Sequence, residues 1–142
     1  MGFDNRLRFE DIQEGDRLPE ARLRMDRETY LAYNRLVREI NPLHFDQAYA
    51  RRLGFREIVV AGVYTFSFIP KMVEDWVGDS GAVGRIEIQY RNPIYLGDAI
   101  VQKASVRKKS ADQDNKWIEC EVMVEDEEGN PLTRAVVTVE FS

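Results

Sequence analysis

Residues 39–46 contain the side chains best suited to acid–base chemistry. His44 is the only histidine in the 142 residues, and it follows Glu39 by five positions. Asn41-Pro42 lies between them, and the residue before a proline is disfavoured in helical geometry, so the segment is expected to be irregular. A carboxylate and an imidazole brought together on such a segment can move a proton to and from a bound molecule. The segment therefore predicts an acid–base pair of Glu39 and His44.

Two predicted helices flank this segment and must position it. Residues 27–39 carry apolar side chains at helical spacing, with Asp26 placed to cap the first turn. Residues 47–53 form a second, short helix that Asp46 caps and Gly54 closes. The apolar stripe of the first helix consists of Tyr30, Tyr33, Leu36, Val37 and Ile40.

The most apolar part of the chain follows, at residues 58–69. We expect a turn at Ala61-Gly62 and then a helix over 63–77 with protein on most of its sides. Pro70 would remove a backbone hydrogen bond and kink that helix. A buried parallel strand over 58–69 is the competing interpretation, because a continuous apolar run fits both structures.

The second half of the chain alternates apolar and polar residues with period two. This pattern predicts a meander of about four antiparallel strands with one buried face. Including one short strand before the first helix, the predicted strands are 20–25, 85–90, 100–109, 116–125 and 134–141. The fold class is thus α+β, in one domain over residues 1–142, with helices on one face of a sheet that wraps the most apolar helix. Exposed edge strands would favour dimerisation.

Composition excludes some classes of function. The net charge is −5, from 20 basic and 25 acidic residues, which argues against nucleic acid as the main partner. Cys120 is the only cysteine, so an intramolecular disulfide is impossible and a reducing compartment is expected. The sequence contains no recognisable signal peptide and no apolar run long enough to span a bilayer. We expect a soluble, cytoplasmic protein that does not associate with membranes.

The segment around His44 resembles the hydratase motif of the MaoC-like dehydratase family, which includes the (R)-specific enoyl-CoA hydratases. The family pattern is roughly Gly-Asp-x-Asn-Pro-Leu-His-x-Asp-x-x-x-Ala. The matching residues here are Arg38-Glu39-Ile40-Asn41-Pro42-Leu43-His44-Phe45-Asp46-Gln47-Ala48-Tyr49-Ala50. Residues 9–16, 54–62 and 90–98 are similar to the family's opening, to the entry of its central helix and to its strand–bulge–strand segment. The resemblance therefore extends over nearly the whole chain.

The resemblance implies a hot-dog fold, in which an antiparallel sheet curls around a long central helix and usually dimerises. It implies an acyl thioester of coenzyme A or acyl carrier protein as substrate, in a tunnel at the dimer interface, with no metal or redox cofactor. Glu39 would then be the base, while His44 would position a water and exchange its proton. Asn41 would orient the loop or the carboxylate. Of the other substrate-binding residues, Gly62 would bind the thioester oxygen through its N–H and Ser67 would be a polar group of the pocket.

Two departures from the family pattern keep other functions open. Glu39 stands where the family has Asp, and Arg38 stands where it has Gly. The longer side chain moves the carboxylate by about one methylene, and a displacement of about 1 Å can lower a rate roughly a hundredfold. A non-catalytic hot-dog subunit or acyl-thioester binding protein that pairs with an active partner is the first alternative to a lyase. An acyl-CoA thioesterase is the second. In each case we expect a homodimer or a heteromer with a related hot-dog chain.

Overall fold

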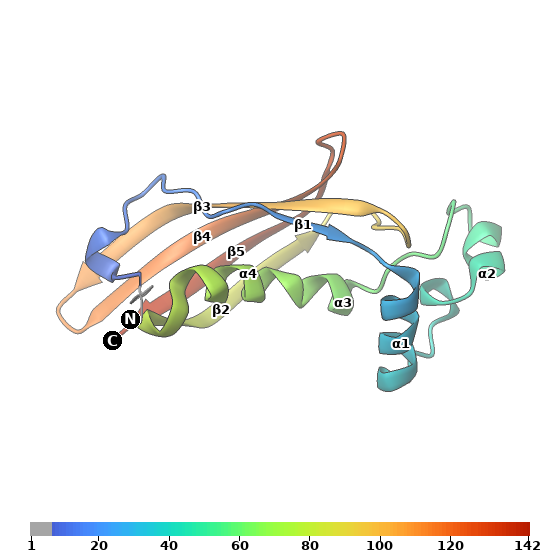
Figure 1. Cartoon of the computed structure of the whole chain (residues 1–142), viewed down its shortest axis with the longest axis horizontal. Helices are drawn as coiled ribbons and strands as arrows, with labels where there is room; N and C mark the ends of the chain where they lie inside the picture. The colour runs from blue at the N-terminus through green and yellow to red at the C-terminus, as the bar shows by residue number, and fades with distance from the viewer. Residues whose placement is uncertain (1–6) are drawn as a thin grey trace, which may run out of the picture.

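A curled antiparallel sheet of five strands forms the frame of the molecule (Figure 1). The computed structural model describes residues 7–142. The strands are β1 (Ala21–Arg24), β2 (Gly81–Tyr90), β3 (Ala99–Asp112), β4 (Asn115–Asp126) and β5 (Pro131–Phe141). Their order across the sheet is β1-β3-β4-β5-β2, so β1 and β2 are the edge strands. The predicted meander is confirmed, with β2 beside β5 instead of β3.

The buried face of the sheet follows from the alternation in sequence. Successive side chains of a strand point to opposite faces, so one residue in two reaches the core. Ile118, Cys120 and Val122 on β4 are fully buried, as are Val137 and Val139 on β5. The core therefore lies on a single face of the sheet.

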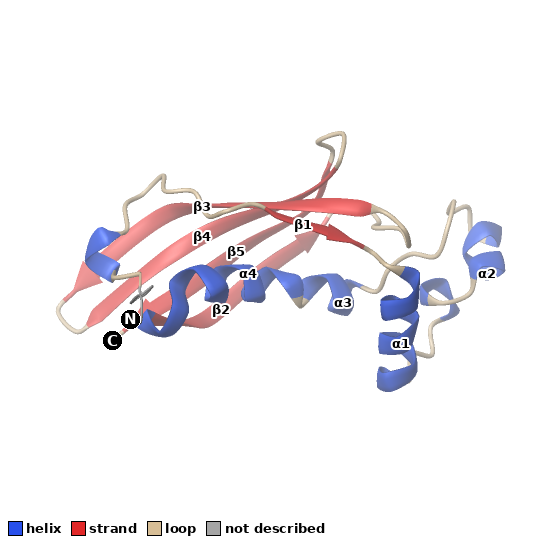
Figure 2. Cartoon of the chain, in the orientation of Figure 1, coloured by secondary structure: helices blue, strands red, loops and turns tan. Residues whose placement is uncertain are grey.

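Two consecutive helices, α3 (Gly62–Phe66) and α4 (Phe68–Val77), cover that face (Figure 2). The competing prediction of a parallel strand over 58–69 is wrong. The predicted helix over 63–77 is correct in position, but it is divided at Ser67 instead of being kinked at Pro70. Pro70 has no N–H to donate to the carbonyl four residues earlier, so the break falls on the turn that precedes it.

The remaining helices lie beyond one end of the sheet (Figure 2). They are α1 (Arg27–Val37) and α2 (Gln47–Arg52), and three short 3₁₀ turns complete the structure: η1 (Phe9–Asp11), η2 (Pro42–His44) and η3 (Gly78–Ser80). Both predicted N-caps are confirmed: Asp26 accepts from the N–H of Thr29, and Asp46 accepts from the N–H of Tyr49.

The apolar stripe of α1 enters the core only at its beginning. Tyr30 is fully buried, but Leu36 and Ile40 are 83% and 88% exposed. The second half of the predicted apolar stripe is therefore not packed in the core, because α1 lies beyond the end of the sheet (Figure 1).

These elements build the expected α+β hot-dog arrangement, an antiparallel sheet curled around a central helix. Within residues 7–142, each helix is too short or too polar to cross a bilayer.

Candidate active site

The loop between α1 and α2 is folded by its own side chains. α1 ends where Arg38 adopts left-handed backbone angles, with φ of 56°. The side-chain oxygen of Asn41 then accepts from the N–H of Leu43 at 3.1 Å, and Pro42 opens the turn η2. Proline suits the start of a helical turn, because its φ is already fixed and the N–H that it lacks would have no partner there. This turn ends at His44.

The His44 ring is fixed by the main chain. Its Nδ1 lies 2.9 Å from the carbonyl oxygen of Val59. A carbonyl oxygen only accepts, so Nδ1 must carry the proton that makes this bond. In the neutral ring, Nε2 is then the nitrogen left to take up a proton. The arrangement gives His44 the tautomer that a base or a water-positioning group requires.

Tyr30 joins the His44 loop to the start of α3. Its hydroxyl donates to the carbonyl oxygen of His44 at 2.8 Å and accepts from the N–H of Ala61 at 2.9 Å. Asn34 donates to the same His44 carbonyl at 3.0 Å. Burial raises the pKa of the Tyr30 phenol, so the hydroxyl keeps its proton over the neutral range. The sequence pattern predicted Tyr30 only as part of the apolar stripe of a helix. Its burial was the available signal, since a buried phenol needs a hydrogen-bonding partner.

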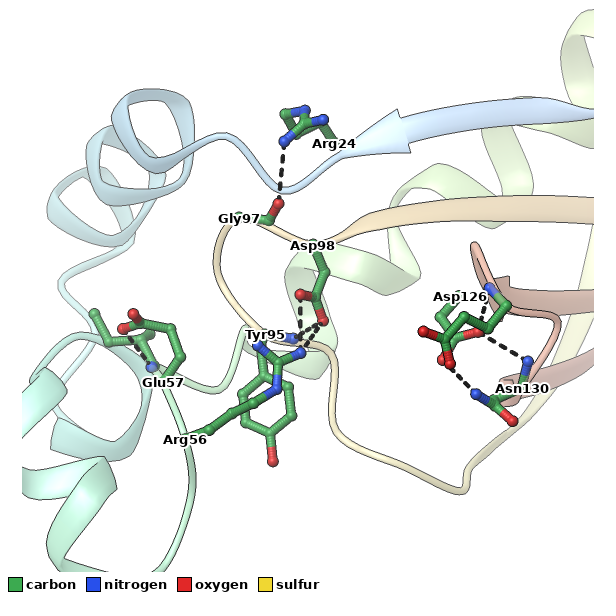
Figure 3. Close-up of polar contacts among 10 residues, drawn as sticks. Arg24, Arg56, Glu57, Tyr95, Gly97, Asp98, Asp126 and Asn130 are labelled. Carbon is green, nitrogen blue, oxygen red and sulfur yellow. Dashed lines mark hydrogen bonds and ion pairs between the residues drawn. The ribbon is translucent and has the colours of Figure 1, made fainter.

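Residues 58–60, which include the Val59 carbonyl that His44 binds, are hydrogen-bonded to the loop after β2. The N–H of Val60 donates to the carbonyl of Ile94 at 2.7 Å, and that of Leu96 donates to Ile58 at 3.0 Å. Figure 3 shows side chains that connect the chain just before residues 58–60 to the loop after β2. The Arg56 guanidinium lies 4.0 Å from the Tyr95 ring centroid and 2.9 Å from both carboxylate oxygens of Asp98.

His44 and Gly62 line one cavity of about 350 Å³, which has a mainly apolar wall. Gly62 begins α3, so its N–H has no acceptor inside the helix. The Tyr90 ring covers Gly62 closely: its hydroxyl donates to the Gly62 carbonyl at 3.0 Å, and a Cβ at position 62 would lie 3.0 Å from the ring. Close packing against the Tyr90 ring favours glycine here. Asn92 and Pro93, predicted only as a bend, also line this cavity.

Glu39 lines a second cavity, of about 330 Å³, together with Asn34, Arg38 and Phe45. Its carboxylate accepts from the N–H of Asn41 at 2.9 Å. Within residues 7–142 the structure has no hydrogen bond between Glu39 and His44, and no ion pair between Glu39 and Arg38. The pairing of Glu39 with His44 therefore stays a prediction.

The other predicted site residues occupy different positions. Asn41 lies in the loop and shapes it through the Leu43 contact. Ser67 is exposed at the break between the central helices, where its hydroxyl donates to the Tyr64 carbonyl at 2.6 Å. Its role as a pocket residue stays a prediction. Among residues 7–142, no group of three or more His, Cys, Asp or Glu side chains is placed to hold a metal ion.

Comparison with known proteins identifies related sequences over most of the chain. A family model described as the MaoC like domain matches residues 8–128. A mitochondrial 3-hydroxyacyl-acyl-carrier-protein dehydratase from Solanum lycopersicum is 32% identical over 100 residues, which are 68% of this chain and 59% of the relative. The chain spans about three fifths of the length of the curated relatives it matches.

Solved structures share the same fold. The (R)-hydratase from A. caviae superposes with a TM-score of 0.81 at 17% identity, covering 94% of this chain and 99% of that one. A chain of the ChsH1–ChsH2 complex from Mycobacterium tuberculosis superposes with a TM-score of 0.78 at 22% identity, covering 92% and 98%.

Proposed function

Because the chain belongs to the MaoC-like domain family, we propose that it hydrates trans-2-enoyl thioesters or dehydrates 3-hydroxyacyl thioesters of coenzyme A or acyl carrier protein. The observation that supports the proposal most is the cavity that His44 and Gly62 both line. The His44 imidazole has a fixed tautomer there, and the Gly62 N–H has no acceptor within its helix. Hydration adds hydroxide to C3 of the enoyl group and a proton to C2. It needs a base for the water and a donor for the enolate oxygen that develops.

We assign these roles as the family resemblance suggests. Glu39 is the base that takes a proton from water, and His44 positions that water and exchanges its proton. The Gly62 N–H binds the thioester oxygen, near the positive end of the central helices. Asn41 keeps its role in shaping the loop, and Ser67 is kept as a substrate-binding residue.

The test is a direct assay with crotonyl-CoA and longer trans-2-enoyl-CoAs, followed by loss of the conjugated enoyl absorbance. Glu39→Gln and His44→Ala should each lower kcat at least a hundredfold, because a positioned acid–base group contributes roughly that much or more. Release of free thiol without a hydroxyacyl product would instead identify a thioesterase. No turnover of any of these thioesters, either alone or with a second hot-dog chain present, would overturn the lyase assignment.

One observation favours the non-catalytic subunit as a second candidate. Glu39 and His44 line two different cavities, and the Glu39 carboxylate is bonded to the Asn41 N–H of its own loop. A protomer of this kind would bind thioester while a partner chain supplies the base. Activity that is unchanged by Glu39→Gln, and that appears only with a second chain, would support this candidate.

We further propose that the protein pairs with a second hot-dog chain, identical or related. β2 is an edge strand of ten residues, and edge strands present unpaired backbone groups. Val63 and Tyr90, beside the His44 cavity, are 64% and 53% exposed. The similar ChsH1–ChsH2 structure is itself a complex of two chains.

A further inference from the structure

One residue in the wall of the His44 cavity has a buried hydroxyl without a hydrogen-bond partner. Thr133, on β5, is 2% exposed and lines the same cavity as His44 and Gly62. Within residues 7–142, its Oγ1 makes no hydrogen bond. A buried hydroxyl without a partner costs about 1–3 kcal/mol, and folded proteins contain few of them.

The isolation of Thr133 differs from that of the other two buried groups of this kind. Asn34 and Gln102 each have an unpartnered side-chain oxygen, but the amide nitrogen of each donates to a carbonyl, of His44 and Phe68 respectively. The Thr133 side chain has only one polar group, and that group makes no hydrogen bond within residues 7–142.

The strand itself does not require a hydroxyl at this position. The next inward-facing residues of β5 are Ala135, Val137 and Val139, all of them apolar. Valine has the shape of threonine, with a methyl group in place of the hydroxyl, and would fill this site without the cost of burying a polar group. Packing on β5 therefore does not account for the hydroxyl at position 133.

Thr133 is also close to the proposed reaction centre. It pairs with Tyr90 across the β2–β5 ladder, so the two side chains lie on the same face of the sheet. Tyr90 in turn bonds the carbonyl of Gly62. Thr133 and Gly62 therefore both flank Tyr90 in the wall of the same cavity.

We propose that Thr133 is a ligand-binding residue of this site, whose hydroxyl donates a hydrogen bond to a carbonyl oxygen of the bound acyl thioester. The proposal rests on the proposed function and adds a contact to it. Two carbonyl groups of a thioester substrate fit this chemistry, the thioester carbonyl itself and the nearest amide carbonyl of the pantetheine arm.

The experiment compares three variants of the full chain in two measurements. Calorimetry gives the affinity for butyryl-CoA, a saturated thioester that cannot be hydrated, and steady-state kinetics give KM and kcat for crotonyl-CoA. Thr133→Val should raise the dissociation constant and KM about five- to thirtyfold, the effect of one hydrogen bond. Thr133→Ser keeps the hydroxyl and should bind within about threefold of the wild type. Thr138→Val makes the same change on the other face of β5 and is the matched control.

Thermal stability separates binding from folding. Thr133→Val should melt at the wild-type temperature or about 3 °C above it, because a buried unpaired hydroxyl is removed. Thr133→Ser should melt lower, since it loses a buried methyl group. A purely structural role predicts the opposite ranking, with valine the less stable and both variants unchanged in affinity.

S-ethyl thiocrotonate, which has no amide, identifies the carbonyl. A Thr133→Val defect that persists with this compound assigns the thioester carbonyl, and a defect that disappears assigns the pantetheine amide. Wild-type affinity and KM in Thr133→Val with every substrate would overturn the proposal and leave the enzyme assignment standing. Failure of the wild type to bind or convert any thioester would overturn both.

Discussion

The geometry of the site depends on single hydrogen bonds made by fully buried side chains. Tyr30 is the clearest case, because one hydroxyl serves both the His44 carbonyl and the Ala61 N–H. These two partners belong to segments that are far apart in sequence, the loop after α1 and the start of α3. Losing the hydroxyl would leave the Ala61 N–H unpaired and the His44 carbonyl with the Asn34 amide as its one remaining side-chain donor. It would also remove this link between the His44 loop and the start of α3.

Tyr30→Phe should lower the free energy of unfolding by about 1–3 kcal/mol, the cost of leaving buried polar groups without a partner. It should also lower kcat more than it raises KM, because the His44 ring and the Gly62 N–H would no longer keep a fixed separation. Urea unfolding and steady-state kinetics give the two values. Tyr33→Phe is the control, since its half-buried phenol contacts the core without either of these bonds. Equal effects of the two changes would contradict the role of Tyr30.

Cys120 is a residue whose burial is expected to make its thiol unreactive. It is fully buried on β4, and burial raises the pKa of its thiol to about 12. We expect no reaction of the native protein with iodoacetamide at pH 8, and full reaction in guanidinium chloride, as measured by mass spectrometry. The unfolded thiol ionises near its ordinary pKa of 9.0. Stability should therefore fall as the pH rises from about 9 toward 12, because only the unfolded chain can release the proton. Rapid alkylation of the folded protein would show that β4 opens.

At the scale of elements, the segment over residues 58–60 is held by contacts that do not touch the cavity. The Arg56 guanidinium binds Asp98 and stacks on Tyr95, which ties the segment to the loop between β2 and β3 (Figure 3). The segment in turn supplies the Val59 carbonyl that orients His44. The Arg56–Asp98 pair is partly exposed, so its own contribution to stability is small.

Arg56→Met should therefore change activity more than stability. We expect kcat to fall about three- to tenfold, because a displacement of a fraction of an ångström in the Val59 carbonyl disturbs the His44 ring. The melting temperature should change by about 2 °C or less. Lys71→Met removes an exposed ion pair with Asp75 on α4 and is the matched control, with no expected change in kcat. A stability loss proportional to the activity loss would instead show that Arg56 supports the fold as a whole.

Much of this element layout follows from local sequence patterns. Period two located β2 to β5, and the side chains of Asp26 and Asp46 located the starts of α1 and α2. The break at Ser67 was missed, because the absence of an N–H at Pro70 shows that a helix hydrogen bond is lost but not at which residue the helix divides. The exposure of Leu36 and Ile40 was also missed, since a helix's own pattern does not say where the sheet ends.

The site was less predictable than the fold. His44 and Gly62 were expected from their motif and share a cavity. Tyr30 and Thr133 were not expected as site residues, because each acquires its role from segments distant in sequence. A single sequence shows which side chains can do chemistry, but not which buried hydroxyl meets which cavity.

For the whole molecule, the distribution of exposed apolar groups indicates where a second chain would pack. Val63 and Tyr90 lie beside the cavity, and β2 forms the nearby open edge of the sheet (Figure 1). A partner that covers this region would also exclude water from the thioester site, which strengthens the electrostatic interactions inside it.

We expect sedimentation velocity to give about twice the 16.5 kDa chain mass. Val63→Glu should shift the protein toward monomer, because a buried carboxylate without a partner is costly at an interface. Activity should fall in parallel with the dimer fraction as the protein is diluted. Leu53→Glu alters a side chain of similar exposure, directly after α2, and is the control. A stable, fully active monomer would contradict the pairing proposal.

The contact between His44 and the Val59 carbonyl has one more consequence. Where a carboxylate orients a histidine, that orientation weakens in acid as the carboxylate takes up a proton, and one substitution abolishes it. A peptide carbonyl does not titrate, and no change of the Val59 side chain can delete it. The orientation of the His44 ring is therefore insensitive to residue identity at position 59. This orientation depends on the path of the backbone. Any sequence that keeps η2 packed against residues 58–60 therefore keeps the His44 ring in the same orientation.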